Sequence, residues 1–142
     1  MVKQISVFLE NKSGRLVRVA QALGEANINI RGLSIADTSD FGILRLIVDQ
    51  PDKAVAELKN RGVMATVTEV IAMEVPDQPG GLAKVLAYLE AAGINIEYLY
   101  SFVEKQSRDA IIMMRVEKIQ EALAVLEENN IPILSGERIY SL

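Results

Sequence analysis

The sequence lacks cysteine and histidine, two residue types that carry much of protein chemistry. The absence of cysteine excludes disulfides and thiolate nucleophiles, and without either residue the usual ligands of zinc are missing. Histidine is also the commonest general base near neutral pH. We therefore expect no metal, no cofactor and no catalysis that depends on such groups.

Basic residues and long apolar runs are also scarce. Lysine and arginine number 15 against 19 acidic residues, for a net charge of −4. This balance argues against a nucleic-acid partner, because phosphate binding requires a basic surface. No stretch approaches the roughly 18 apolar residues that span a membrane, and polar residues interrupt the N-terminus too early for a signal peptide. We expect a soluble, cytoplasmic protein without a membrane partner.

The sequence does contain one unit that is used twice. Residues 9–33 and 75–99 align at an offset of 66 residues, which relates Gly14 to Gly80 and Asn29 to Asn95. Nine of these 25 aligned positions are identical. A repeat of this kind indicates one supersecondary unit present in two copies. We predict two units, at residues 1–68 and 69–142.

Each copy is predicted to follow the order β-α-β-β-α-β, from apolar periodicity and turn residues. In the first copy we expect strands at residues 3–9, 28–36, 41–48 and 63–68, a helix after Gly14 and another that begins at Pro51. In the second copy we expect strands at residues 69–75, 94–104, 109–116 and 131–135, helices at 80–92 and 118–129, and a short tail. This order is the ferredoxin-like pattern of an α+β fold, with two helices on one face of an antiparallel sheet.

Several local features are predicted within this frame. Asn11 or Ser13 is expected to cap the first helix, a turn is expected at residues 38–40, and Gly93 is expected at a helix C-terminus. The apolar parity slips in the second strand of each copy, after Ile30 and after Ile96, which indicates a β-bulge. The expected buried stripe of the first helix consists of Leu16, Val19, Ala20 and Leu23.

The third strand of each copy is apolar on both faces, whereas a sheet with one face in water would alternate. The residues concerned are Ile43, Leu44, Leu46, Ile47 and Val48, and Ile111, Ile112, Met113 and Met114. We predict that the helix-free face is covered, by a second copy of the chain or by the other half. On this basis we expect a homodimer.

The turn before each first helix is a candidate binding site for a small anion. Free N–H groups at a helix N-terminus attract a carboxylate, and Gly14 and Gly80 let a ligand approach the backbone closely. Asn29 and Asn95 begin an edge strand, and an amide can accept from an ammonium or donate to a carboxylate. The residues alone are equally compatible with purely structural turns.

The motif Asp77-Gln78-Pro79-Gly80-Gly81-Leu82, followed by residues 92–96 (AGINI), resembles the signature of ACT domains. Residues 11–16 (NKSGRL) and 26–30 (ANINI) resemble it too, with Ser13 in place of the usual proline. The resemblance covers both halves and implies a stand-alone tandem ACT protein, that is, a small-molecule regulatory module, most often for amino acids. ACT domains commonly pair side by side through the second strand and first helix.

By position, the resemblance implies two sets of ligand contacts, in which we expect Asn11 and Asn95 to contribute most. In the first copy they are Asn11, Ser13, Gly14, Arg15, Leu16, Asn29 and Ile30, and in the second Asp77, Gln78, Pro79, Gly80, Gly81, Leu82, Asn95 and Ile96. Asp77 lacks the amide donor of Asn11 and adds negative charge, so the two sites need not be equivalent.

Two functions follow as hypotheses. The first is a non-catalytic sensor that binds a free amino acid at the seam between two ACT units. The alternative is a ligand-free regulatory subunit that docks onto a metabolic enzyme, for example one of amino-acid metabolism. A small hydrolase is disfavoured, because no nucleophile with an adjacent base is evident.

Overall fold

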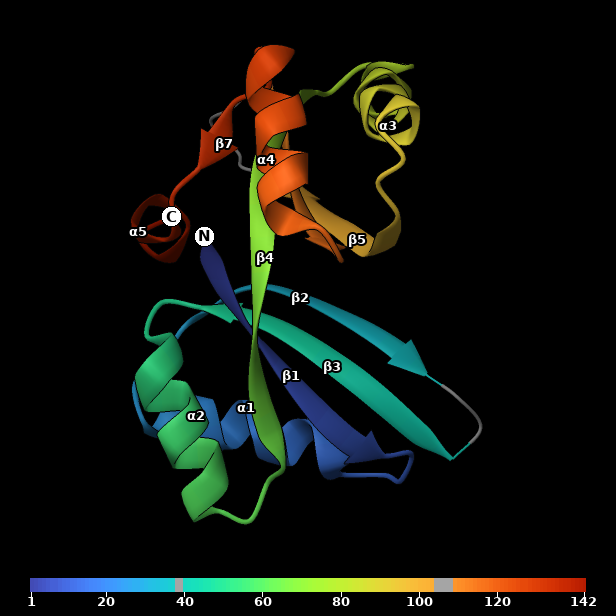
Figure 1. The fold of residues 1–142 in the computed structure, drawn as a ribbon. Coiled ribbons are helices and arrows are strands. Elements are labelled where there is room, and N and C mark those ends of the chain that lie inside the picture. Colours follow the sequence, from blue (N-terminus) through green and yellow to red (C-terminus); the bar gives the residue numbers. More distant parts are fainter. Residues whose placement is uncertain (38–39, 104–108) are drawn as a thin grey trace. The chain divides into compact units, whose positions relative to one another are not determined.

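The chain forms two compact units in a computed structural model that describes residues 1–37, 40–103 and 109–142. The N-terminal unit comprises Lys3–Thr68 and Tyr140–Leu142, and the C-terminal unit comprises Glu69–Ile139 together with Met1–Val2. Each unit combines antiparallel strands with helices, which confirms the predicted α+β fold with two β-α-β-β-α-β repeats (Figure 1).

The elements follow the predicted order. The N-terminal unit contains β1 (Val2–Glu10), α1 (Arg15–Glu25), β2 (Ile30–Asp37), β3 (Phe41–Val48), α2 (Pro51–Asn60) and the first part of β4 (Ala65–Pro76). The C-terminal unit contains the rest of β4, α3 (Gly81–Ala91), β5 (Ile96–Val103), β6 (Asp109–Val116), α4 (Ile119–Glu128), β7 (Ile133–Leu134) and α5 (Gly136–Tyr140). The helix α5 is a correction, because only a tail was predicted there. Thr38 and Ser39 of the predicted turn, and the predicted strand end at Glu104, lie outside the described residues.

In the N-terminal unit the strand order is β2-β3-β1-β4, so that β2 is an edge strand. The helices α1 and α2 lie on one face of this sheet (Figure 1). Their buried stripes meet the inward side chains of β1 and β3 in a single core that includes Ile5, Val7, Val19, Leu23, Leu44, Leu46 and Leu58. The predicted stripe of α1 is partly wrong, because Ala22 is buried while Leu16 and Ala20 are exposed.

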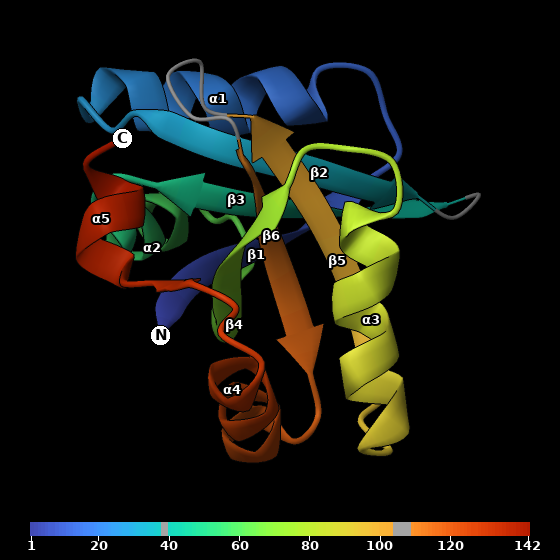
Figure 2. The ribbon, with the colours of Figure 1, turned by 90° about the horizontal axis from the view of Figure 1, so that it is seen from above.

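In the C-terminal unit β6 pairs with both β4 and β5, and β7 pairs with β4 on its other side, which leaves β5 at an edge. Figure 2 shows α3 and α4 on the same side of these strands. The core beneath them includes Ile71, Met73, Val85, Leu89, Ile112, Met114 and Leu126. No helix in the described part of the chain is long and apolar enough to cross a membrane.

The predicted bulges are present at equivalent places in the two edge strands. The pairing of β2 with β3 shifts register between Ile30 and Gly32, and that of β5 with β6 shifts between Ile96 and Tyr98. After the bulge, Leu33 lies opposite Leu46 and therefore on the helix side of the sheet. The parity slip in the sequence thus reported a real extra residue in each strand.

The helix-free faces of the two sheets differ in exposure. Ile111 and Met113 of β6 are fully buried within a single chain, although they do not belong to the helix-side core. On the helix-free face of the N-terminal unit, by contrast, Phe8 and Phe41 are exposed.

Candidate functional site

Each candidate turn leads into a helix through a glycine in the left-handed region. Gly14 has φ 89° and Gly80 has φ 83°, and each occupies the N-cap position of its helix. Other residues rarely adopt this conformation, because a Cβ approaches the following carbonyl. A Cβ built at either glycine would meet no atom within 4 Å, so both turns face open space.

The expected capping by Asn11 or Ser13 is wrong. No side chain caps α1 or α3 in the described structure. The carbonyl oxygens of Gly14 and Gly80 accept the first helical hydrogen bonds, from Arg18 N–H at 3.2 Å and Lys84 N–H at 3.1 Å. A helix leaves its first N–H groups without intrahelical partners. In each turn the first of these groups is already engaged, because Arg15 N–H donates to the Lys12 carbonyl at 3.3 Å and Gly81 N–H donates to the Gln78 carbonyl at 3.0 Å. An anion at this end, which the helix dipole favours, would therefore use the N–H groups of the residues that follow.

The two turns differ in charge. In the first turn, the Glu10 carboxylate contacts the Lys12 ammonium at 3.0 Å and the Arg15 guanidinium at 3.6 Å. The hydrogen bond and the charge of Lys12, together with the charge of Arg15, lower the pKa of Glu10. In the second turn, Asp77 is exposed. The first turn therefore joins one carboxylate to two cations, whereas the second offers a carboxylate at the equivalent of Asn11.

Gly81 gives the second turn a tight approach that the first turn lacks. A Cβ at Gly81 would overlap the carbonyl oxygen of Pro76, so only glycine fits there without a shift of the backbone. The equivalent residue of the first turn is Arg15, whose side chain is about 39% exposed. The two turns therefore share a leading glycine but differ in backbone packing.

Asn29 and Asn95 lie just before the edge strands β2 and β5, and both are exposed. The backbone of Asn29 is fixed by Asp49, because its N–H donates to the Asp49 carboxylate at 3.0 Å and its carbonyl accepts from Asp49 N–H at 3.1 Å. Ile30 and Ile96 instead pack against their respective cores. The side chains of both asparagines are thus available for contact.

Within one unit the turn and the asparagine do not come together. They lie at opposite ends of α1 or α3, each 11 residues long, which at a rise of about 1.5 Å per residue separates them by roughly 16 Å. Around the first turn lie Asn11, Ser13, Gly14, Arg15 and Leu16, and around the second Asp77, Gln78, Pro79, Gly80, Gly81 and Leu82. A single site that uses turn and asparagine together would require two units.

A groove of about 550 Å³ runs along α3 beside the start of β5. It is lined by Ala83, Leu86, Ala87, Glu90, Gly93, Ile94, Asn95 and Ile96. Sequence reasoning identified Asn95 and Ile96 but missed Leu86 and Glu90. The spacing of residues 83, 86 and 90 places them on one face of the helix. This periodicity, together with a following strand that returns beside the helix, could have identified them as groove residues.

The residues that could hold a metal are limited. In the described ranges, no three Asp or Glu side chains are grouped so that they could bind an ion. The polar groups of the groove and turns are amides, carboxylates and backbone N–H groups. Such groups suit a small zwitterion, because they can accept from an ammonium and donate to a carboxylate.

Comparisons with known proteins place this geometry in context. A family model described as an ACT domain pair matches residues 1–142. The crystal structure of protein BT0572 from Bacteroides thetaiotaomicron is similar at 43% sequence identity and a TM-score of 0.94, covering 99% of this chain and 96% of that one. Comparison with curated proteins found no match.

Two more distant structures share the fold. The regulatory subunit of aspartate kinase from Thermus thermophilus, in a ligand-free form, is 21% identical with a TM-score of 0.63, and the match covers 89% of this chain and 91% of that one. The corresponding subunit from Thermus flavus is 19% identical with a TM-score of 0.60, covering 89% and 90%.

Proposed function

This chain belongs to the family of ACT domain pairs, which implies a regulatory, ligand-binding role, and we propose that its ligand is a free amino acid bound where two ACT units meet. One observation supports this most directly. Each helix N-terminus opens onto free space behind Gly14 or Gly80, while the asparagine that would complete the site lies at the far end of the same helix. Two units placed side by side in opposite directions would bring one turn to the other unit's asparagine.

The proposed contacts follow from charge and hydrogen bonding. The α-carboxylate of the ligand accepts from backbone N–H groups at the start of α1 or α3. Its ammonium donates to the amide oxygen of Asn29 or Asn95, and in the C-terminal unit Glu90 supplies a carboxylate in the same groove. The ligand side chain lies against Leu86. The role proposed for the protein is regulatory and non-catalytic, and its cytoplasmic location stays a prediction.

A second copy of the chain is the proposed source of the adjoining unit. The flank of the N-terminal unit formed by α1 and β2 exposes Leu16 (46%), Leu33 (54%) and Ile35 (46%). Leu33 and Ile35 lie opposite Leu46 and Leu44, on the helix side of the sheet. An edge strand next to exposed apolar side chains invites pairing with another unit, so we propose that this flank forms a homodimer.

A ligand that bridges two units binds only the paired state and therefore shifts the equilibrium towards it. Coupling of this kind typically amounts to about 1–3 kcal/mol. The regulatory signal would then be the pairing itself. The alternative is a regulatory subunit that docks onto an enzyme of amino-acid metabolism without any ligand, as the names of the Thermus aspartate kinase subunits suggest.

Calorimetry against the twenty amino acids tests the proposal. We expect at least one to bind more tightly than millimolar, and Gly80→Val to abolish that binding. Asn130→Val is the matched control, because Asn130 also has a positive φ in the C-terminal unit but lies outside the groove and turns. Folded protein that binds none of the twenty would refute the sensor. Native mass spectrometry that shows an enzyme partner but no small molecule would favour the alternative.

A further inference from the structure

The N-terminal unit contains a second, larger cleft on the other flank of α1. The cleft has a volume of about 1030 Å³ and lies between α1, the ends of β1 and β3, and the connection from α2 to β4. The cleft is lined by four residues of α1, namely Arg15, Arg18, Ala22 and Glu25. Leu16 follows Arg15 in the helix and therefore points about 100° away from it around the helix axis. The cleft is therefore distinct from the apolar flank proposed above for pairing.

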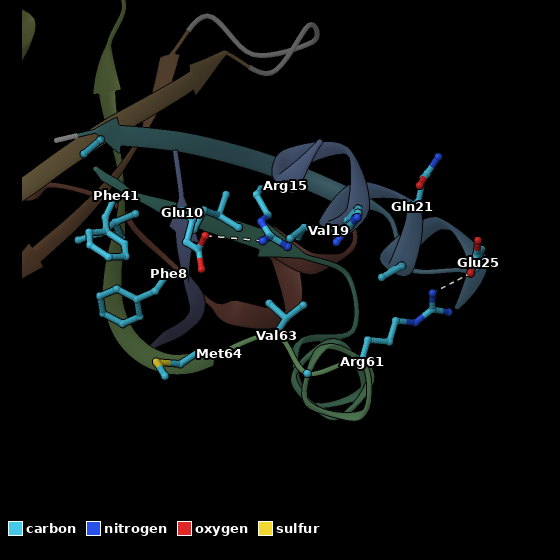
Figure 3. A pocket seen from close by; sticks show the side chains of 16 residues that line it. Phe8, Glu10, Arg15, Val19, Gln21, Glu25, Phe41, Arg61, Val63 and Met64 are labelled. Atoms are coloured by element: carbon cyan, nitrogen blue, oxygen red, sulfur yellow. Dashed lines mark ion pairs between the residues drawn. The ribbon is translucent and has the colours of Figure 1, made fainter. Parts of the chain in front are cut away.

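The floor of the cleft is apolar and its outer rim is aromatic. Leu9 and Val63 pack against the core between α1 and the connection from α2 to β4. Figure 3 shows Phe8 and Phe41 side by side with Met64 near them. These three side chains are 49%, 56% and 68% exposed. The cleft can thus receive an apolar body of considerable size, at the upper end of ordinary ligand pockets.

Positive charge exceeds negative charge along the cleft. The Arg61 guanidinium pairs with the Glu25 carboxylate at 2.8 Å, and Arg15 pairs with Glu10 at 3.6 Å (Figure 3). Arg18 has no ion pair with any described residue. Both carboxylates of the cleft are therefore already engaged by cations, while one guanidinium remains for a ligand. A guanidinium matches a carboxylate in a bidentate geometry.

The second repeat provides an internal comparison on the same backbone frame. The bond from Phe8 N–H to the carbonyl of Met64, 3.2 Å, has its equivalent in the bond from Glu74 N–H to the carbonyl of Pro132, 3.0 Å. Several side chains around that frame differ, although Arg18 corresponds to the basic Lys84 and Val19 to Val85. The second repeat has Tyr88, Gly81, Ala91, Asn129 and Pro132 where the cleft has Ala22, Arg15, Glu25, Arg61 and Met64.

This comparison shows that the frame accepts a bulky residue at the place of Ala22, and that the ionic groups are not needed to build it. Ala22 and the charged residues Arg15, Glu25 and Arg61 are therefore particular to the first repeat, whereas the position of Arg18 is basic in both repeats. A structural explanation for the ion pairs of Arg15 and Arg61 would predict similar pairs in both copies, since both copies form the same connection.

We propose that this cleft binds a small monocarboxylic acid with a branched or aromatic body and no ammonium group. The carboxylate binds Arg18, and the apolar body lies against Leu9, Ala22 and Val63 on the helix side of the sheet. An α-ammonium is disfavoured, because Glu10 and Glu25 are occupied and the remaining charge of the cleft is positive. The 2-oxo acids of the branched and aromatic amino acids have this chemistry. The inference does not depend on the amino-acid site, with which the cleft shares Arg15 at the start of α1.

Calorimetry with matched probe pairs tests the proposal: phenylpyruvate against phenylalanine, and 4-methyl-2-oxopentanoate against leucine. We expect at least one oxo acid to bind with 1:1 stoichiometry to the N-terminal unit and its amino acid not to compete for that site. Arg18→Gln should weaken oxo-acid binding by about tenfold, the effect of losing a charged hydrogen bond. Lys84→Gln, at the equivalent exposed position of the second repeat, is the matched control and should change nothing.

Ala22→Tyr reproduces the residue of the second repeat and should block the cleft while leaving any amino-acid binding intact. Because Ala22 is buried, a ¹⁵N–¹H spectrum must first show that this variant is folded. The exposed variant Arg18→Gln keeps the proposal testable if it is not. Absence of saturable binding by either oxo acid overturns the proposal. Oxo-acid binding that neither variant changes would also overturn the proposal. A protein that binds phenyl phosphate but neither of the two oxo acids would overturn it as well.

Discussion

The two adjacent glycines of the second turn should respond differently to alanine. Gly80 has a positive φ but open space around its Cβ, whereas the Cβ of Gly81 would overlap the Pro76 carbonyl oxygen. For Gly80→Ala the cost is that of the left-handed conformation alone, about 1–2 kcal/mol. Gly80→Asn should cost less, because asparagine tolerates this region.

For Gly81→Ala, whether the substitution stabilises or destabilises the protein tells whether a Cβ at this position overlaps the Pro76 carbonyl. Alanine has a higher helix propensity than glycine by up to about 1 kcal/mol, so in open space this substitution would stabilise the protein. Overlap with a backbone atom cannot be relieved by a side-chain rotation and should cost about 1–3 kcal/mol or more. We therefore expect net destabilisation, with the start of α3 displaced from β4.

Thermal and urea unfolding of wild type and the two alanine variants measure these effects. A loss of 1 kcal/mol corresponds to a decrease in Tm of about 2–4 °C for a chain of this size. Hydrogen exchange should locate the change in the first turn of α3, with α1 unaffected. A Gly81→Ala protein that is as stable as wild type, or more so, would refute the close approach of Gly81 to Pro76.

The remaining predictions concern the N-terminal unit. Leu58→Ala should lower the free energy of unfolding by about 2–5 kcal/mol, because this side chain is fully buried in the core. Arg61→Gln should lower it by at most about 1 kcal/mol, because the ion pair of Arg61 with Glu25 is exposed. Urea unfolding measures both losses, and equal losses would contradict the core assignment. NMR titration should give Glu10 a pKa below the ordinary glutamate value, and Lys12→Gln should raise it. Since the folded state lowers this pKa, the contribution of Glu10 to stability is present above the ordinary value, about 4.3, and is lost as the pH falls through the lowered one.

The repeat made the fold predictable, because two copies of one pattern must satisfy the same packing rules. The bulges after Ile30 and Ile96 could be predicted because side chains alternate strictly along a strand, so one extra residue leaves a visible slip. The helix caps could not, since Ser13 and Asn11 are good capping residues by type but Gly14 occupies the cap position itself.

Exposure and grooves were less predictable, because they depend on which element lies beside a helix. Leu16 fits the apolar period of α1, but its flank faces outward beside an edge strand and stays exposed. Leu86 and Glu90 become groove residues only because β5 returns next to α3. The larger cleft depends on one small residue, Ala22. That a small side chain here leaves space for a ligand becomes clear only from the comparison with Tyr88, which occupies the equivalent position in the second repeat.

The bulge in β2 has a consequence for how one copy of this protein would recognise another. If Arg31 were paired in regular register and did not bulge, Leu33 would lie opposite Arg45, on the helix-free side of the sheet. Instead the guanidinium of Arg31 donates to the Tyr140 carbonyl at 3.2 Å, and Leu33 and Ile35 turn towards the helix side. The bulge at one residue therefore decides which side chains of β2 an approaching molecule would touch.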